Sequence, residues 1–292
     1  MTSLAHLTIL YRGPLSSCNY GCTYCPFAKR HESAAELEGD RRALRRFVAW
    51  CTQREHGLSI FFTPWGEALV HAAYRDALAT LSHLGHVRRV AIQTNLSFSL
   101  DWLPACNLSS LALWVTYHPT EVRSEAFLAR CRTLVDRGVR FSIGAVGVKE
   151  HLPLIENLRN QLPPEVYLWV NAVKELGRYY DSADIARITA VDPLFGINVT
   201  NHRSRGRACR TGSSVIAVDG DGTVRRCHFV DEPLGNLYTG DFESHLSARP
   251  CPKSVCRCHT GYVHLEHLDL DTVFGDGALE RIPANWAANA AK

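Results

Sequence analysis

The stretch SSCNYGCTYCPF, residues 16–27, places Cys18, Cys22 and Cys25 on one short loop with the spacing C-x3-C-x2-C. It directly follows HLTILYR at 6–12, a β-branched and aromatic run that predicts a strand. A closed metal site usually has four protein ligands. Three thiolates therefore leave such a site one protein ligand short. They can bind three irons of a [4Fe–4S] cubane and leave the fourth iron open, because cysteine thiolate is the usual ligand of such clusters.

Length and composition describe an ordinary globular chain. It has 292 residues, enough for one barrel-sized domain or one domain with an appendage, and is 46% hydrophobic and 21% charged. The net charge of +3 is too small to predict nucleic-acid binding, which needs a dense basic surface. No apolar run approaches the roughly 18 residues that span a bilayer, and the N-terminus lacks the features of a secretory signal. We therefore expect a cytoplasmic protein with neither a membrane nor a nucleic-acid partner.

The cysteines fall into two groups and three single positions. In a reducing cytoplasm, clustered cysteines bind metal more often than they pair with each other. Eight of the eleven lie near the start or near the end of the chain, whereas Cys51, Cys106 and Cys131 stand alone in helix-like contexts. We expect these three to be small buried hydrophobes. For the first group, the alternative to iron–sulfur is a zinc knuckle with a distant fourth ligand such as His31.

Short apolar runs alternate with longer amphipathic ones over the first two thirds of the chain. The predicted strands span 6–12, 58–63, 88–94, 111–117, 139–146 and 166–172. The predicted helices span 33–55, 68–84, 121–137, 150–161 and 181–190, with a weaker prediction at 99–108. This alternation indicates an α/β fold with a parallel sheet. Six such units suit a partial barrel or a doubly wound sheet, and in both the functional side chains gather at the carboxyl ends of the strands.

The pattern changes after about residue 196. Residues 213–229, SSVIAVDGDGTVRRCHF, form two strand-like runs around the Asp-Gly-Asp-Gly sequence at 219–222, which predicts a tight hairpin. The chain from there to about 264 is rich in loops and cysteines, and a segment with so little core needs a staple. We therefore divide the chain into a barrel at 1–195 and an extension at 196–292.

CNYGCTYC at the end of the first predicted strand resembles the signature of the radical S-adenosylmethionine (radical SAM) superfamily. The resemblance implies a partial (β/α)6 TIM-like barrel with a C-terminal hairpin extension. It also implies a [4Fe–4S] cluster on Cys18, Cys22 and Cys25 whose open iron is chelated by S-adenosylmethionine (SAM), with Tyr24 packed by the adenine. In that superfamily one electron, from a donor such as flavodoxin or ferredoxin, cleaves SAM to methionine and a 5′-deoxyadenosyl radical. The radical then abstracts hydrogen from the substrate.

A second matching motif follows the second predicted strand. The sequence FTPWGEALV at 62–70 resembles the superfamily's GGE-type stretch, whose backbone and acid hold the SAM amino group. Gly66 and Glu67 match, and Trp65 stands where the first glycine usually is. A carboxylate beside an ammonium group forms a strong charge-assisted hydrogen bond. The alternative for Glu67 is an acid at a helix N-terminus, where the helix dipole favours it.

Residues at the later strand ends are further positions where the superfamily contacts SAM. The resemblance assigns this role to Thr94, Asn95, Thr116, Val146 and Asn171, and also draws on His118. Val146 belongs to a loose match, GAVGVKE at 144–150, to an adenine-side motif that includes Gly144 and Glu150. Each residue taken alone has an alternative as a capped turn. Together the matches cover about residues 7–175 in the expected order.

The second group of cysteines begins with Cys209 and Cys227, which flank Gly222 in the pattern C-x12-G-x4-C. This resembles the hairpin of SPASM and twitch extensions, which hold auxiliary [4Fe–4S] clusters. The resemblance implies one auxiliary [4Fe–4S] cluster, completed by two of Cys251, Cys256 and Cys258, and we favour the last two. The alternative is a structural zinc ribbon.

A basic run, NHRSRGRACR, surrounds the first of these cysteines. It holds Arg203, Arg205, Arg207 and Arg210. These arginines fit three roles: they offset the charge of an anionic cluster, they form a solvated loop, or they bind an anionic substrate.

The predicted reaction is hydrogen abstraction from a small-molecule substrate, followed by oxidation through the auxiliary cluster, as in a dehydrogenase. Candidate proton acceptors at the strand ends are Lys174, Tyr117 and His118. The first strand begins near residue 6, which leaves no room for an N-terminal peptide-recognition domain and favours a small molecule. Two alternatives stay open: maturation of a ribosomally made peptide by crosslinking or epimerisation, and a zinc-stabilised binding module without catalytic activity.

Overall fold

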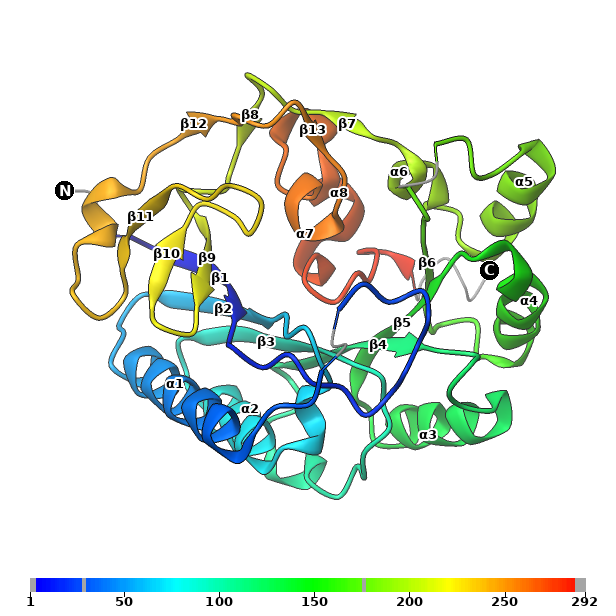
Figure 1. Cartoon of the computed structure of the whole chain (residues 1–292), viewed down its shortest axis with the longest axis horizontal. Helices are drawn as coiled ribbons and strands as arrows, with labels where there is room; N and C mark the ends of the chain where they lie inside the picture. Colours follow the sequence, from blue (N-terminus) through cyan, green and yellow to red (C-terminus); the bar gives the residue numbers. More distant parts are fainter. Residues whose placement is uncertain (1–3, 28–29, 175–176, 287–292) are drawn as a thin grey trace.

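The computed structural model describes residues 4–27, 30–174 and 177–286, and its central element is a nine-stranded sheet. The strand order is β11-β10-β9-β1-β2-β3-β4-β5-β6. Strands β9 and β1 to β6 all run parallel, and β10 and β11 add antiparallel at one edge. Helices α1 to α5 lie around the outside of this curved sheet, and α7 and α8 lie on its inner side (Figure 1).

The six predicted strands are confirmed, each within two residues. They are β1 His6–Arg12, β2 Gly57–Phe62, β3 Val87–Thr94, β4 Leu111–Tyr117, β5 Arg140–Val146 and β6 Leu168–Asn171. The five predicted helices are α1 Ala34–Thr52, α2 Ala72–Ser82, α3 Ser124–Asp136, α4 Leu152–Gln161 and α5 Ser182–Val191. The weaker prediction at 99–108 contains only the 3-10 turn Leu103–Ala105.

Three short helices have no counterpart in the predictions. They are α6 Phe195–Val199, α7 His259–Tyr262 and α8 Leu270–Phe274. With four or five residues each, they span little more than one turn, which is too short to show a helical period. None of the described helices is long and apolar enough to cross a bilayer.

Alternate side chains of each strand face opposite sides of the sheet. On the outer side, residues such as Ile9, Ile60 and Leu113 belong to the large core beneath the helices. On the inner side, a smaller apolar cluster joins Leu10, Phe61, Ala91, Ala112, Trp114, Val215, Ala217 and Leu279. The inner face is therefore the one available to a site at the carboxyl ends of the strands.

The predicted hairpin forms, but it is not separate from the barrel sheet. β9 Val215–Asp219 and β10 Thr223–Arg225 pair antiparallel across Gly222, whose φ of 89° favours glycine. β9 also pairs in parallel with β1, from Thr8 opposite Val215 to Arg12 opposite Asp219. The parallel part of the sheet thus has one strand more than the six predicted, and the proposed boundary at 195 and 196 divides one continuous sheet.

The C-terminal segment packs into the inner face of the sheet. Glu280 is fully buried and forms ion pairs with Arg140 and Arg89, and its carbonyl oxygen accepts a hydrogen bond from the Ser142 hydroxyl. The turn is tight, because a Cβ on Gly277 would collide with the backbone of residue 282. These contacts hold residues 277–282 against β3 and β5.

Replacing Glu280 with Gln should destabilise the fold. The change leaves Arg140 and Arg89 without their buried counter-charge, and removing one partner of a buried pair costs about 3 kcal/mol in the free energy of unfolding. Urea unfolding followed by circular dichroism measures the loss. The matched control is Glu38→Gln, which breaks the exposed pairs with Arg41 and Arg45 and should change little. Equal stability of the two variants would contradict the anchoring role of Glu280.

Candidate functional site

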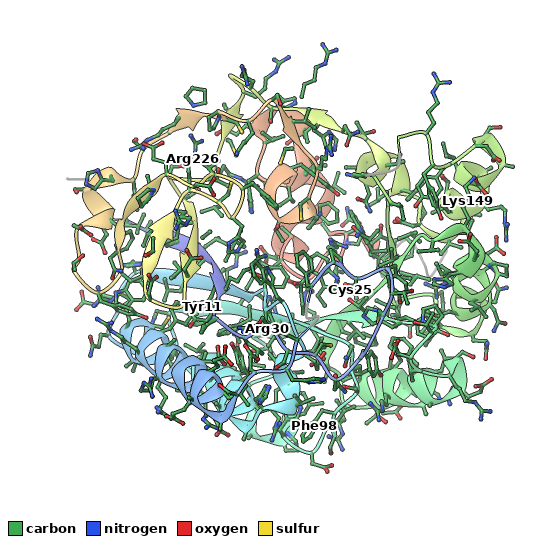
Figure 2. All side chains as sticks on the ribbon, viewed as in Figure 1. Tyr11, Cys25, Arg30, Phe98, Lys149 and Arg226 are labelled. Atoms are coloured by element: carbon green, nitrogen blue, oxygen red, sulfur yellow. The ribbon has the colours of Figure 1, made fainter. Side chains whose placement is uncertain are left out.

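The three-cysteine loop crosses the carboxyl ends of β3 and β4. The Asn19 amide donates to Ser97 at 2.9 Å and accepts from Asn95 at 3.0 Å. The backbone N–H of Gly21 donates to Glu121, just after β4, at 3.1 Å. In the view of Figure 2, Cys25 lies on this loop over the central strands. The loop therefore lies where parallel α/β proteins place their functional groups.

Glu32 fixes the start of the loop, and the sequence predictions missed it. Its carboxylate accepts hydrogen bonds from the backbone N–H and the hydroxyl of both Ser16 and Ser17, at 2.5 to 3.1 Å. These bonds lower the pKa of Glu32 although burial opposes the shift. No motif marks this residue; the acid-rich start of α1 is the one local signal.

Burial makes the thiols of Cys18 and Cys22 weaker acids in the absence of metal. It raises the pKa of Cys22 to about 11 and also raises that of Cys18. Metal binding must therefore displace protons from these sulfurs. Within the described ranges, no three His, Cys, Asp or Glu side chains are grouped so that they could hold a metal ion. The donor set, three thiols on one loop, fits the iron–sulfur cluster that the resemblance implies.

His118 lies directly against the loop. Its Nδ1 is 3.3 Å from the Cys22 sulfur and 3.0 Å from the Tyr24 hydroxyl, and its ring stacks on Tyr24 at 6.0 Å. Burial lowers the pKa of His118 to about 4, so the imidazole is neutral at pH 7. The structure thus brings two predicted site residues, Tyr24 and His118, into contact with a predicted cluster ligand.

The second motif also meets the loop. Gly66 packs so closely on Ser17 that an added Cβ would overlap the Ser17 carbonyl oxygen, and the next residue, Glu67, donates its N–H to that oxygen at 3.2 Å. Trp65, at the position that departs from the motif, is 47% exposed and stacks on Phe27. Gly66 is therefore required for the packing of the cysteine loop.

Glu67 is fully buried and accepts three hydrogen bonds. One carboxylate oxygen accepts from the Thr94 hydroxyl at 2.8 Å and from the Leu69 N–H at 3.1 Å, and the other accepts from the Asn95 N–H at 2.5 Å. Burial raises its pKa to about 7, and these bonds limit the shift. Glu67 is also the N-cap of the 3-10 turn Ala68–Val70, so the predicted alternative, an acid at a helix N-terminus, describes its contacts here.

The remaining predicted residues divide between the two faces of the sheet. By strand alternation Thr116, Val146 and Asn171 share the inner face with Trp114, Ser142 and Trp169. Tyr117 lies on the opposite face, 2% exposed in the core and packed on Phe127 at 4.9 Å. The structure does not bring Tyr117 to the cysteine loop. Its burial against α3 explains an aromatic residue at this position without a catalytic role.

The five cysteines of the second group lie in the same region of the extension, but no three of these described side chains are grouped closely enough to hold a metal ion. Strand β8 Ala208–Cys209 pairs with β12 Arg249–Pro250, which leads into Cys251, and β13 Val255–Cys256 pairs with β7 His202–Arg203. Cys256 lies within electrostatic range of Cys209, Cys227, Cys251 and Cys258. Burial raises the pKa of both Cys256 and Cys227, the latter to about 11. The choice among Cys251, Cys256 and Cys258 as ligands stays a prediction.

Lys174 belongs to the second group of cysteines. Its ammonium donates to the carbonyl oxygens of Arg257 at 2.7 Å and Thr200 at 3.2 Å, close to Cys258 and Cys256. Burial lowers its pKa to about 8. Lys174 could therefore exchange a proton near neutral pH, next to the second cysteine group.

The basic run lies largely in solvent. Arg203, Arg205 and Arg207 are exposed, and Arg210 pairs with Asp271. Cys51, Cys106 and Cys131 are buried, as predicted. The exposed arginines therefore belong to the surface, and the three single cysteines belong to the core.

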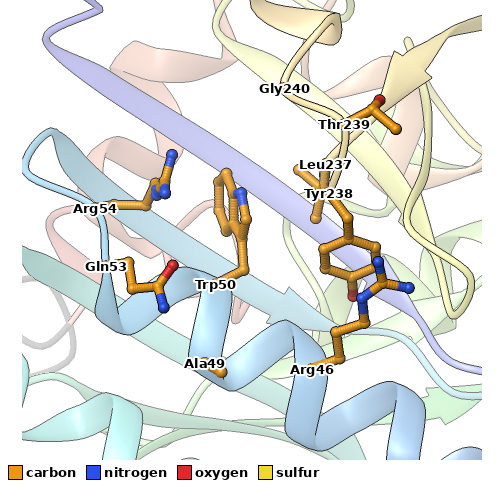
Figure 3. A pocket seen from close by; sticks show the side chains of 9 residues that line it. All are labelled: Arg46, Ala49, Trp50, Gln53, Arg54, Leu237, Tyr238, Thr239 and Gly240. Carbon is orange, nitrogen blue, oxygen red and sulfur yellow. The ribbon is translucent and has the colours of Figure 1, made fainter.

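One hollow of the described surface lies away from these residues. It measures about 420 Å³ and lies between α1 and residues 237–240, where the Arg46 guanidinium covers the Tyr238 ring at 3.6 Å (Figure 3). Its lining includes none of the predicted site residues. The arrangement of the cysteines, and not this hollow, therefore defines the candidate site.

The parallel sheet, the cysteine loop at its carboxyl end and the cysteine-rich extension agree with the architecture that the resemblance implies. No protein-family model matches the chain, and no curated protein matches its sequence. Among solved structures, native anSMEcpe with bound AdoMet and Kp18Cys peptide is similar over 83% of this chain and 81% of its own, with 13% identity and a TM-score of 0.54. Native anSMEcpe with bound AdoMet is similar over 79% of this chain and 78% of its own, with 16% identity and a TM-score of 0.53. Both structures share little sequence identity with this chain, so the likeness shows the fold: a mixed α/β fold with a large parallel sheet, consistent with the partial TIM-like barrel that the resemblance implies.

Replacing Gly66 with Ala should displace the cysteine loop, because the new methyl group would overlap the Ser17 carbonyl oxygen. We expect loss of at least half of the iron bound after anaerobic reconstitution, measured by metal analysis, with a fall in thermal stability. The matched control is Gly85→Ala, where no atom lies within 4 Å of an added Cβ. Full iron binding and unchanged stability in the Gly66 variant would show that this contact does not position the loop.

Proposed function

We propose that the protein cleaves SAM reductively at a [4Fe–4S] cluster held by Cys18, Cys22 and Cys25. The observation that supports this most is the position of a three-thiol loop at the carboxyl end of β1, in a fold shared with AdoMet-bound structures. Three thiols leave one iron for SAM. When bound, the cluster supplies the electron that splits the sulfonium and so provides the 5′-deoxyadenosyl radical.

The protein's own residues would orient the cofactor and the loop. Tyr24, fixed by His118, is placed to pack by the adenine. Glu67 accepts hydrogen bonds from Thr94 and Asn95, and these three residues would support the cysteine loop from behind. Gly66 presents backbone close to the cysteines, where the SAM amino group would bind. In this proposal Thr116, Val146 and Asn171 contact the nucleoside from the inner face of the sheet.

The second group of cysteines would hold one auxiliary [4Fe–4S] cluster, on Cys209, Cys227 and two of the other three. The position of the other four within electrostatic range of Cys256 supports this assignment. The radical barrel would be residues 1–195 and the auxiliary segment 196–292. Lys174, beside this group, is a candidate acceptor for the proton that leaves an oxidised substrate.

Two substrate classes remain candidates for this site. A small molecule, oxidised through the auxiliary cluster, is the class that the sequence favoured. A peptide substrate has comparable support, because the anSMEcpe structures contain the Cp18Cys and Kp18Cys peptides. For either class, the electron would come from flavodoxin or ferredoxin.

Visible absorption distinguishes the zinc-stabilised binding module from both enzyme proposals. Iron–sulfur protein absorbs broadly near 400 nm, whereas a zinc protein does not. Absorption and metal analysis of the purified protein decide between them.

Cys22→Ala should abolish 5′-deoxyadenosine formation when reconstituted protein is incubated anaerobically with SAM and dithionite, because two thiolates hold the first cluster poorly. Cys227→Ala should still form 5′-deoxyadenosine, because it changes only the second group. Chromatography of the nucleoside and iron analysis measure both effects.

Cys106→Ala is the matched control, because Cys106 is buried outside both groups. It should retain the iron content and the product of the wild type. Unchanged nucleoside formation in Cys22→Ala would overturn the assignment of the first cluster.

A further inference from the structure

Arg281 occupies an unusual position on the inner side of the sheet. It is 5% exposed and lies between two indole rings, with its guanidinium carbon 3.3 Å from the centre of the Trp114 ring and 4.3 Å from that of Trp169. Trp114 is on β4 and Trp169 on β6, so the guanidinium lies across β5. Its positive charge is stabilised by the π faces of both rings.

The backbone of Arg281 is strained. Arg281 has φ of 58°, a conformation that non-glycine residues rarely adopt. The neighbouring residue, Glu280, is held by Arg140 and by the Ser142 hydroxyl. Glu280 thus anchors the segment, and the next residue, Arg281, is held in a strained backbone conformation. Strain of this kind concentrates at functional sites.

Hydrogen-bond donors around Arg281 lack acceptors. Within the part of the chain that the structure describes, the Arg281 Nε, the Trp169 Nε1 and the Tyr262 hydroxyl are buried and have no hydrogen-bond partner. Asp192 has a carboxylate in electrostatic range of Arg281, and this carboxylate already accepts from the Tyr167 hydroxyl at 2.5 Å and from two backbone N–H groups. Native proteins rarely leave buried donors unsatisfied, so this group lacks an acceptor.

Two further cations lie near the same place. Arg281, Lys174 and Arg12 all lie within electrostatic range of Cys258. Arg12 ends β1, immediately before the residues that lead to the three-cysteine loop. Positive charge therefore converges on the inner side, beside the second group of cysteines.

We propose that Arg281 binds a carboxylate of the substrate and so determines which substrates the enzyme accepts. Because the two indoles cover the faces of the guanidinium, its donors are left at the edge, where a planar carboxylate can accept two parallel hydrogen bonds. Arg281 is a specificity-determining residue, and Lys174 and Arg12 add attraction for the anion. This inference rests on the proposed function, since it places the substrate between the two groups of cysteines.

Binding of a simple probe tests the inference without knowledge of the substrate. Reconstituted protein is titrated with acetate, and with acetamide as the neutral isostere, while tryptophan fluorescence is recorded. Trp114 and Trp169 flank the guanidinium, so acetate should give a saturable change and acetamide should not. Failure of acetate to bind the wild-type protein, or equal binding of acetamide, would overturn the proposal.

The variants separate substrate binding from other roles of Arg281. Arg281→Gln should weaken acetate binding at least tenfold, and Arg281→Lys about three- to fivefold, because an ammonium cannot bind a carboxylate through two fixed donors. Arg41→Lys, a change on the outer helix α1, should bind acetate as the wild type does. Circular dichroism and iron content verify that each variant is folded, and if Arg281→Gln does not fold, the Lys variant and the wild-type titration decide the question.

Two further measurements distinguish the alternatives. If Arg281→Gln shifts the reduction potential of the auxiliary cluster while acetate binding is unchanged, the guanidinium serves the cluster and the proposal is wrong. Formation of 5′-deoxyadenosine by the wild type without substrate is measured in parallel. Absence of that product in the wild type would refute the proposed function, whereas failure of the wild type to bind acetate would refute only this inference.

Discussion

The approach of two backbones, at Ser17 and Gly66, is the constraint on which the site depends. A three-cysteine loop has no regular hydrogen-bond ladder of its own, so its geometry must be imposed by its surroundings. Here the Ser17 carbonyl oxygen accepts the Glu67 N–H, and only a glycine at 66 allows the two chains to come so close. Glu32 holds the other side of the same backbone through the N–H groups of Ser16 and Ser17. The loop is thus held from two sides before any metal binds.

Burial then sets the electrostatic conditions around both groups of cysteines. It raises the pKa of Cys22 and of Cys227, so that forming thiolates there is costly without positive charge nearby. At the first group the polar neighbours include a neutral His118, the Asn95 amide and the carboxylates of Glu67 and Glu121. The second group has Lys174 and Arg281 within electrostatic range. The two groups therefore differ in how their charge can be balanced, which agrees with the different roles proposed for them.

Local patterns predicted most of the fold and the first site, and contacts between distant residues account for what they missed. Strand and helix periods, and the spacing of Cys18, Cys22 and Cys25, are properties of short segments. The pairing of β9 with β1 joins residues about 200 positions apart along the chain, and strand periodicity does not identify a strand's partner. Tyr117 shows the reverse error: a polar tip at a strand end suggested a catalytic group, but the alternation of the strand turns its ring into the core.

The inner face of the sheet is formed by side chains from the parallel strands and from the C-terminal segment. The parallel strands supply a curved surface with Trp114 and Trp169 on its inner side, but most inner side chains of the lower strands are apolar. Glu280 neutralises the arginines at the base, and the next residue along the chain projects its guanidinium between the two indoles. A cation in such a position is stable only because the rings cover its faces, and the same covering leaves its donor edge without an acceptor. The chain has therefore placed a buried guanidinium with an unsatisfied donor between two indole rings on the inner side of the sheet.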